Sequence, residues 1–414
     1  MSGPEDKSAS LLQREFFPSP RLLLGPGPSL VHPRVLHALS APLIGHLDPE
    51  FLQLLDETQA ALRQIFGTTN SFTMALSGTG SAGMEGVMVN LLEPGDTAVV
   101  GVNGVFGSRL ATIAERGGAK VIRVEAPWGR TIDVETIRST VRRSGPVKLV
   151  AIVHAETSTG ACQSLSEIGR LCHETDTLFV VDAVTSLGGI PVQVDAWHID
   201  ACYSATQKCL SCPPGLAPVT LSPRALAAMR RRRVPCPSWY LDFSLLADYW
   251  DESTRRYHHT APISMIYALR EALRLVLEEG LENRFARHRR HGRALVAGMA
   301  TLGLTPLPLE NERLPMLHCL TLPTGIDDQQ VRAELLRSHG IEIGGGLGPL
   351  QGSVWRIGLM GESSTASNVL SLLQALELIW LRRGWRCPAP GAALAAAASV
   401  LDEGPTIHSE RSTP

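Results

Sequence analysis

Short hydrophobic runs rich in Val and Ile alternate with helical or turn segments through the middle of the chain. The runs cover residues 97–102, 120–124, 149–154, 178–182 and 200–204. A helical segment such as 164–174 separates two of them. Strands that alternate with helices form a mostly parallel sheet covered on both faces. The pattern therefore predicts an α/β fold with such a sheet at its centre.

The regions before and after this central part have a different pattern of hydrophobic positions. Residues 29–90 have a mainly helical pattern, in which Phe51, Leu54, Leu55 and Leu62 fall on one helix face. After a long basic helix at 281–302, two apolar runs at 316–322 and 354–359 enclose a helix at 328–339. We therefore expect four parts, namely an N-terminal arm (1–20), a large domain (21–280), a smaller C-terminal α/β domain (281–385) and a disordered, dispensable tail (386–414).

Composition narrows the class of partner. The 414 residues are 44% hydrophobic, and 38 Lys and Arg against 40 Asp and Glu give a net charge of -2. A net charge so close to zero gives no overall electrostatic attraction for nucleic acid or an anionic membrane. We therefore expect a small-molecule substrate. The chain has no apolar run of about 18 residues and no signal-peptide pattern. We expect a cytoplasmic protein with reduced cysteines, with a peroxisomal or mitochondrial location left open.

Two charged residues at strand ends are candidates for chemistry. Asp182 ends the run 178–182, and Lys208 ends the polar stretch that follows 200–204. Ligands of parallel sheets bind at the carboxyl ends of the strands. Pyridoxal-phosphate chemistry needs an amine that forms a Schiff base with the cofactor aldehyde and an anion that keeps the pyridine nitrogen protonated. Lys208 and Asp182 are our candidates for these two roles; a surface lysine and a turn aspartate are the alternatives.

A Gly/Ser-rich turn supplies a candidate phosphate cradle. Ser77-Gly78-Thr79-Gly80-Ser81-Ala82-Gly83 directly precedes a helical run at 84–92. Small residues let backbone N–H groups approach an anion, and a helix N-terminus adds partial positive charge. An ordinary turn with a helix cap would look the same. Together with Lys208 and Asp182, the turn becomes a third part of one site.

The chain resembles fold-type I pyridoxal-phosphate aminotransferases of the alanine–glyoxylate/serine–pyruvate group. The resemblance covers nearly all of residues 21–382 in the family's order, through the segments 24–28, 77–80, 92–96, 154–160, 181–188, 207–208, 257–260 and 356–358. It implies a homodimer that uses pyridoxal 5'-phosphate and small amino-acid and 2-oxo-acid substrates. We expect no metal, because Cys209 and Cys212 form a Cys-x-x-Cys without a second Cys or His pair at zinc spacing.

The resemblance also implies how the cofactor is held. Lys208 would bind it covalently and move a proton between the substrate Cα and the cofactor C4', and Asp182 would pair with the pyridinium. Thr157 is our first choice, and Ser158 our second, for contact with the ring, and Phe106 would stack on it where close relatives carry Trp. A buried core phenylalanine is the alternative for Phe106. The phosphate would be held by Thr79, Gly80, Ser81 and Gln207, and by Tyr257 and Thr260 of the neighbouring subunit.

Substrate recognition is expected at Arg356 and Gly25. Arg356 stands between apolar neighbours in a predicted strand, where a charge is costly without a partner. A substrate α-carboxylate would be that partner, and a structural salt bridge is the alternative. Gly25 and its neighbours Pro26 and Gly27 would line the pocket end that receives a small side chain.

The resulting hypothesis is a transaminase that moves the amino group of alanine or serine to glyoxylate, giving pyruvate or hydroxypyruvate and glycine. Serine–glyoxylate, 3-hydroxykynurenine and 2-aminoethylphosphonate transamination within the same fold stay open. A cofactor-binding homologue without turnover is disfavoured because the lysine, aspartate, phosphate turn and arginine are all present.

Overall fold

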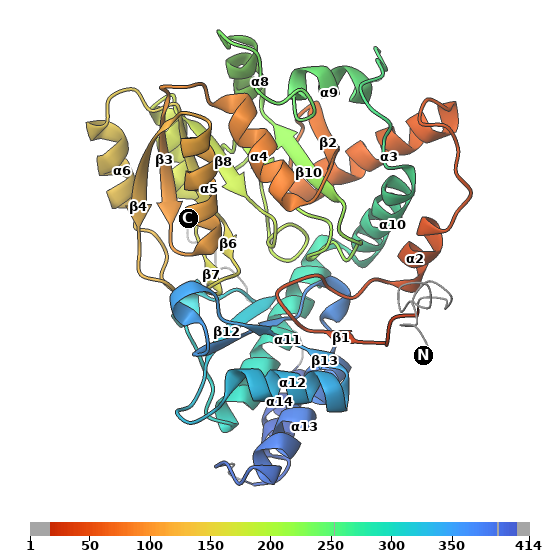
Figure 1. Cartoon of the computed structure of the whole chain (residues 1–414), viewed down its shortest axis with the longest axis vertical. Coiled ribbons are helices and arrows are strands. Elements are labelled where there is room, and N and C mark those ends of the chain that lie inside the picture. The colour runs from red at the N-terminus through yellow and green to blue at the C-terminus, as the bar shows by residue number, and fades with distance from the viewer. Residues whose placement is uncertain (1–16, 252, 387–388, 404–414) are drawn as a thin grey trace, which may run out of the picture.

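The computed structural model describes residues 17–251, 253–386 and 389–403. Figure 1 shows a larger lobe above a smaller one. A seven-stranded sheet lies at the centre of the larger lobe, in the order β2 (Phe72–Ser77), β10 (Leu216–Leu221), β9 (Ala201–Tyr203), β8 (Leu178–Asp182), β5 (Leu149–Val153), β3 (Thr97–Val102) and β4 (Lys120–Glu125). The strands from β9 to β4 are parallel, whereas β10 is antiparallel to both of its neighbours. The α/β fold with a mostly parallel sheet is confirmed.

Helices cover this sheet on both faces, because its central strands have no polar side. Every residue of β5 and β8 is buried. The helices α4 (Gly80–Leu91), α5 (Val105–Arg116), α6 (Val134–Arg143), α7 (Ser166–Glu174) and α8 (Pro223–Arg230) pack against the strands or against each other. The register pairs Asp182 with Val153 on one side and with Tyr203 on the other, so these residues share the carboxyl edge.

The N-terminal helices form the side of the larger lobe that carries α10 (Figure 1). Here α2 (Pro33–Leu39) and α3 (Pro49–Phe66) pack on α10 (Ile263–Glu279). Asp48 caps α3 by accepting from the N–H of Glu50, and Gly67 ends the helix at a φ of 62°. The mainly helical pattern predicted for 29–90 missed β2, which lies in the sheet.

The smaller lobe has its own core. Helices α11 (Leu281–Thr301), α12 (Asp328–His339) and α13 (Ala366–Arg382) accompany an antiparallel sheet of β11 (Thr305–Pro306), β12 (Leu317–Thr321), β15 (Val354–Gly358) and β14 (Gly344–Gly345). The N-terminal strand β1 (Leu22–Leu23) pairs with β13 (Ile341–Glu342), and Leu24 is buried in the same core. The start of the predicted large domain at residue 21 is therefore wrong for 22–24, which belong to the smaller lobe by packing.

The predicted disordered tail contains an ordered helix. α14 (Ala392–Asp402) packs on α11 and α13, and Ala393 and Ala397 are completely buried. Glu377 of α13 accepts from the N–H groups of Gly391 and Ala393 at 3.1 and 2.7 Å. The prediction of disorder is wrong for 392–402, while 404–414 and residues 1–16 of the arm lie outside the described residues. Within the described ranges, no helix combines the length and hydrophobicity that crossing a membrane requires.

Candidate active site

Lys208 lies in the loop that follows β9, where the N-terminal segment packs against it. Its Nζ donates to the carbonyl oxygen of Pro26. A Cβ at Gly27 would lie 2.6 Å from this Nζ, and Gly27 has a φ of 111°, so only glycine fits there. Burial lowers the pKa of Lys208 to about 8, helped by the nearby positive charge of Arg356. The loop of Gly25, Pro26 and Gly27 thus meets the predicted lysine.

Asp182 is held in place at the end of β8. Its Oδ1 accepts from the N–H of Val184, and its Oδ2 accepts from the hydroxyl of Tyr203, each at 2.8 Å. Burial raises the pKa of Asp182 to about 6, although the two hydrogen bonds and Lys208 favour the charged form. Sequence reasoning missed Tyr203, which has no distinguishing motif and is recognisable only once its strand is placed beside β8.

The predicted phosphate turn adjoins the lysine segment. Thr79 is the N-cap residue of α4 but makes no side-chain hydrogen bond to the helix. A Cβ at Gly80 would lie 2.7 Å from that of Ala205, so the turn packs directly on the residues that lead to Lys208. Gln207 has a buried Oε1 without a partner in the described part of the chain. The uncapped N-terminus of α4 fits the phosphate of the cofactor, whereas the free Oε1 of Gln207 is an acceptor and would need a donor.

The two candidates for ring contact have different surroundings. The Oγ of Ser158 donates to Glu156 at 2.5 Å and accepts from the N–H of Val105 at 3.0 Å. Thr157 is buried, and among the described residues its hydroxyl makes no hydrogen bond. The structure thus leaves Thr157 free for a ligand, whereas Ser158 supports the start of α5, which carries the partly buried Phe106. Glu156 was also missed as a site residue, although a glutamate directly after the apolar strand β5 (Leu149–Val153) and its neighbour His154-Ala155 is a usable signal.

Arg356 brings a buried positive charge to the same place. It lies on β15 with 8% of its surface exposed, and its Nε donates to the carbonyl oxygen of Gly345 at 2.7 Å. No carboxylate within the described ranges forms an ion pair with it. The N–H of Gly358 donates to Leu24, which places Gly25 beside this strand. The structural salt bridge considered as the alternative is therefore absent from the described residues.

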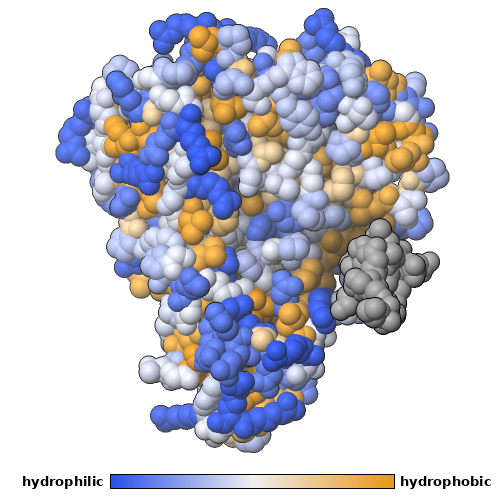
Figure 2. All heavy atoms as spheres, viewed as in Figure 1, coloured by the Kyte–Doolittle hydropathy of each residue, from blue (hydrophilic) through white to orange (hydrophobic). Residues whose placement is uncertain are grey.

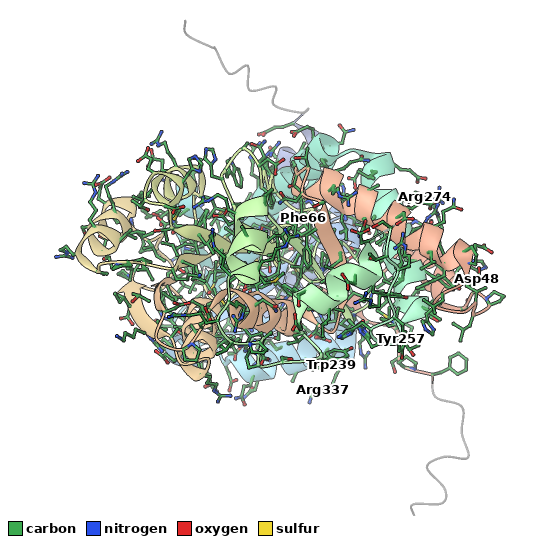
Figure 3. All side chains as sticks on the ribbon, turned by 90° about the horizontal axis from the view of Figure 1, so that it is seen from above. Asp48, Phe66, Trp239, Tyr257, Arg274 and Arg337 are labelled. Atoms are coloured by element: carbon green, nitrogen blue, oxygen red, sulfur yellow. The ribbon has the colours of Figure 1, made fainter. Side chains whose placement is uncertain are left out.

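Tyr257 and Thr260 are not joined to the Lys208 group within one chain. Tyr257 is 54% exposed, and its hydroxyl lies 3.5 Å from that of Thr260. Figure 3 places Tyr257 at the edge of the molecule, with Trp239 near it. His259, which lies between Tyr257 and Thr260 in the sequence, forms a hydrogen bond with Ser77 of the phosphate turn at 2.8 Å. This segment therefore touches its own phosphate turn while Tyr257 faces outward.

The cysteines near the lysine are not arranged as a metal site. The thiol of Cys209 donates to the carbonyl oxygen of Thr185, and burial raises its pKa to about 12. Cys212 is also buried and unpaired as a disulfide. In the described ranges, no group of three or more His, Cys, Asp or Glu side chains is placed to hold a metal ion.

Comparisons with known proteins define the class to which this arrangement belongs. Residues 24–362 match the family described as Aminotransferase class-V, and the chain belongs to this family. It is 43% identical over 94% of its length to the (S)-ureidoglycine–glyoxylate transaminase of Bacillus subtilis, of which it covers 97%. It is 40% identical over 89% of its length to the alanine–glyoxylate aminotransferase of Drosophila melanogaster, of which it covers 94%.

Solved structures agree with this assignment. The crystal structure of the ureidoglycine–glyoxylate aminotransferase from Bacillus subtilis superposes with a TM-score of 0.91 at 45% identity, covering 94% of this chain and all of that one. The chain is therefore a pyridoxal-phosphate-dependent transaminase of fold type I. The residues present fit this class. The amine of Lys208, the carboxylate of Asp182 and the uncapped N-terminus of α4 lie together at the carboxyl edge of the sheet.

Proposed function

We propose that the protein transfers the amino group of a small 2-amino acid, with alanine and serine as first candidates, to glyoxylate, giving the matching 2-oxo acid and glycine. The observation that carries the proposal is the buried guanidinium of Arg356, which has no carboxylate partner in the described residues. A buried charge of this kind is costly unless it is paired, and a substrate carboxylate would pair it bidentately. Both relatives named above are transaminases whose names include glyoxylate.

The reaction divides its tasks among residues of this chain. Bound pyridoxal phosphate supplies an electron sink for the bond that breaks at the substrate Cα. Lys208 has a pKa of about 8, so near neutral pH a useful fraction of its amine is free to take a proton from Cα and return it. Asp182 would stabilise positive charge on the ring nitrogen, and Arg356 would fix the α-carboxylate. Thr79, Gly80, Ser81 and Gln207 would hold the phosphate, Phe106 and Thr157 the ring, and Gly25 would limit the side chain of the substrate.

A second donor is favoured by a specific observation. (S)-Ureidoglycine is also a 2-amino acid. The Bacillus subtilis transaminase named for it is 43% identical to this chain over 94% of the chain's length. Since Arg356 would bind the α-carboxylate of either donor, the difference between alanine and ureidoglycine depends on the part of the pocket that receives the side chain.

The complete site is proposed to require two copies of the chain. Tyr257 and Thr260 face away from their own Lys208 group and would reach the cofactor phosphate of the partner. Hydrophobic side chains on the surface support a contact there, since Leu43, Leu47 and Trp239 are 70%, 47% and 62% exposed. Figure 2 shows hydrophobic residues at the surface where α2, α3 and α10 lie in Figure 1.

The test is a donor panel with purified, cofactor-loaded protein. Glyoxylate is supplied with alanine, serine, (S)-ureidoglycine, 3-hydroxykynurenine or 2-aminoethylphosphonate, and glycine is quantified. We expect glycine with at least one small 2-amino acid and a KM for that donor that rises at least about tenfold in Arg356→Lys, since Lys cannot bind bidentately. If no donor yields glycine, glyoxylate is not the acceptor and the proposal is wrong.

A further inference from the structure

A buried carboxylate, that of Glu156, accepts a hydrogen bond from the backbone of Phe106, the residue assigned to stacking on the cofactor ring. Glu156 belongs to β6 (Ala155–Glu156) and has no exposed surface. It forms no ion pair within the described ranges, although a buried carboxylate normally needs a cation or several hydrogen-bond donors. None of the roles proposed above uses it.

The carboxylate instead receives four donors from two segments. Its Oε2 accepts from the N–H of Phe106 at 3.0 Å and of Gly107 at 3.3 Å. Its Oε1 accepts from the N–H of Ser158 at 3.0 Å and from the hydroxyl of Ser158 at 2.5 Å. The hydroxyl of Ser158 in turn accepts from the N–H of Val105 at 3.0 Å. All these contacts favour the ionised form of Glu156, although burial raises its pKa.

These bonds satisfy three of the four N–H groups that are left free at the start of a helix. The first three residues of α5 are Val105, Phe106 and Gly107, whose N–H groups have no acceptor inside the helix. The N-cap residue is Gly104, which has no side chain to supply one. Glu156 and Ser158 satisfy all three groups from a segment some 50 residues away, and a negative charge at a helix N-terminus is itself favourable.

Close packing makes this attachment rigid. A Cβ at Gly104 would lie 2.4 Å from the Oγ of Ser158 and 2.5 Å from the Cγ and Cδ of Glu156. The backbone at the start of α5 therefore rests directly on the carboxylate. A displacement of Glu156 would move the first turn of the helix, and with it Phe106.

We propose that Glu156 is a positioning residue for the cofactor, which holds the first turn of α5 so that the ring of Phe106 lies against the pyridine ring. The inference rests on the proposed assignment of Phe106. Its distinguishing consequence is that Glu156 acts through Phe106, so that the two residues are energetically coupled in cofactor binding and not independent.

The test is a double-mutant cycle on the dissociation constant of pyridoxal phosphate, measured by titrating apoprotein of Glu156→Gln, Phe106→Ala and the double variant. Gln keeps the shape of the side chain but replaces one acceptor oxygen by a donor. We expect Glu156→Gln to weaken cofactor binding about tenfold in the wild type and less than about twofold in the Phe106→Ala background. Gly104→Ala, which pushes on Glu156 without changing its charge, should show the same pattern and replaces Glu156→Gln if that variant does not fold.

The control is Asp133→Ala, which removes the carboxylate that accepts from the N–H of Thr136 at the start of α6. It should lower stability without changing cofactor affinity. Equal losses from Glu156→Gln in both backgrounds would overturn the inference and leave Glu156 a purely structural residue. If Phe106→Ala binds the cofactor as tightly as the wild type, the inference also falls, whereas the proposed function, judged by glycine formation, would be unaffected.

Discussion

The hydroxyl of Tyr203 donates a 2.8 Å hydrogen bond to Oδ2 of Asp182, and the two residues face each other across β9 and β8. Both side chains are buried. The hydrogen bonds from the Tyr203 hydroxyl and from the N–H of Val184 both stabilise the ionised form of Asp182 and lower its pKa. If Asp182 pairs with the ring nitrogen of the cofactor as proposed, Tyr203 would act on the cofactor through Asp182.

Replacing Tyr203 by Phe should therefore weaken cofactor binding. The substitution removes one donor to a buried carboxylate, raises the pKa of Asp182 further, and costs on the order of 1–3 kcal/mol of pairing with the ring nitrogen. We expect a fall in pyridoxal-phosphate affinity of about 5- to 150-fold, measured by titration of the apoprotein. Tyr267→Phe is the matched control, because its hydroxyl donates to Pro42 away from the site. Unchanged affinity in Tyr203→Phe would contradict the role assigned to this bond.

Lys208 should reduce the stability of the apoprotein near neutral pH. Its pKa in the folded chain is about 8, below the ordinary 10.5, so protonation favours the unfolded chain and stability is lost as the pH falls from 10.5 through 8. The cost is fully present below about pH 8 and amounts to about 3 kcal/mol at most. Lys208→Met apoprotein should thus be more stable than the wild type at pH 7, with the difference falling below about 1 kcal/mol at pH 10.

Urea unfolding of the two apoproteins at both pH values measures this difference. Lys120→Met, at an exposed position of β4, provides the control and should change stability little at either pH. A difference that is the same at pH 7 and pH 10 would show that the gain comes from packing of the methionine and not from the lysine charge.

The predicted parts of the fold were those that local sequence determines. The strands β3, β5 and β8 consist of Val- and Ile-rich runs that have no polar face, and their predicted bounds agree with the structure within one residue. By contrast, β2 has the sequence Phe-Thr-Met-Ala-Leu-Ser and lies beside a helical region, so its pattern did not distinguish strand from helix. It is a strand because it pairs with β10, some 145 residues later.

The missed site residues and the missed helix share one cause, since each depends on a distant partner. Tyr203 contacts Asp182 through strand register, and Glu156 caps a helix that starts 51 residues before it. The alanine-rich run of α14 resembles low-complexity sequence, but its backbone at Ala393 lies against Gly298 of α11, where the missing side chain permits close approach. Lys208, Asp182 and the phosphate turn could be predicted because each ends or follows a strand, or precedes a helix, that is visible in the sequence.

Arg284 should be important for the loop that carries Lys208. It is buried at the start of α11, where its guanidinium donates to the carbonyl oxygens of Gly188 and Cys209 at 3.0 and 2.6 Å and pairs with Glu279. Lysine cannot reach all three acceptors, so Arg284→Lys should lower the free energy of unfolding by about 2–4 kcal/mol. Chemical denaturation measures this loss, and Arg289→Lys, at an exposed position of the same helix, should change stability by less than about 0.5 kcal/mol. Equal effects of the two variants would contradict the argument.

The helix α14 should be required for stability, contrary to the sequence-based prediction of a dispensable tail. Truncation after Arg386 removes Ala393, Ala397 and Leu401 from the core of the smaller lobe and uncovers the facing sides of α11 and α13. Burial of these side chains and the two hydrogen bonds to Glu377 together correspond to about 3–5 kcal/mol, so the truncated protein should unfold at clearly lower urea concentration. Truncation after Glu403 keeps the helix and should leave the transition unchanged. If both truncated proteins unfold like the full chain, the packing of α14 contributes nothing to stability and this prediction is wrong.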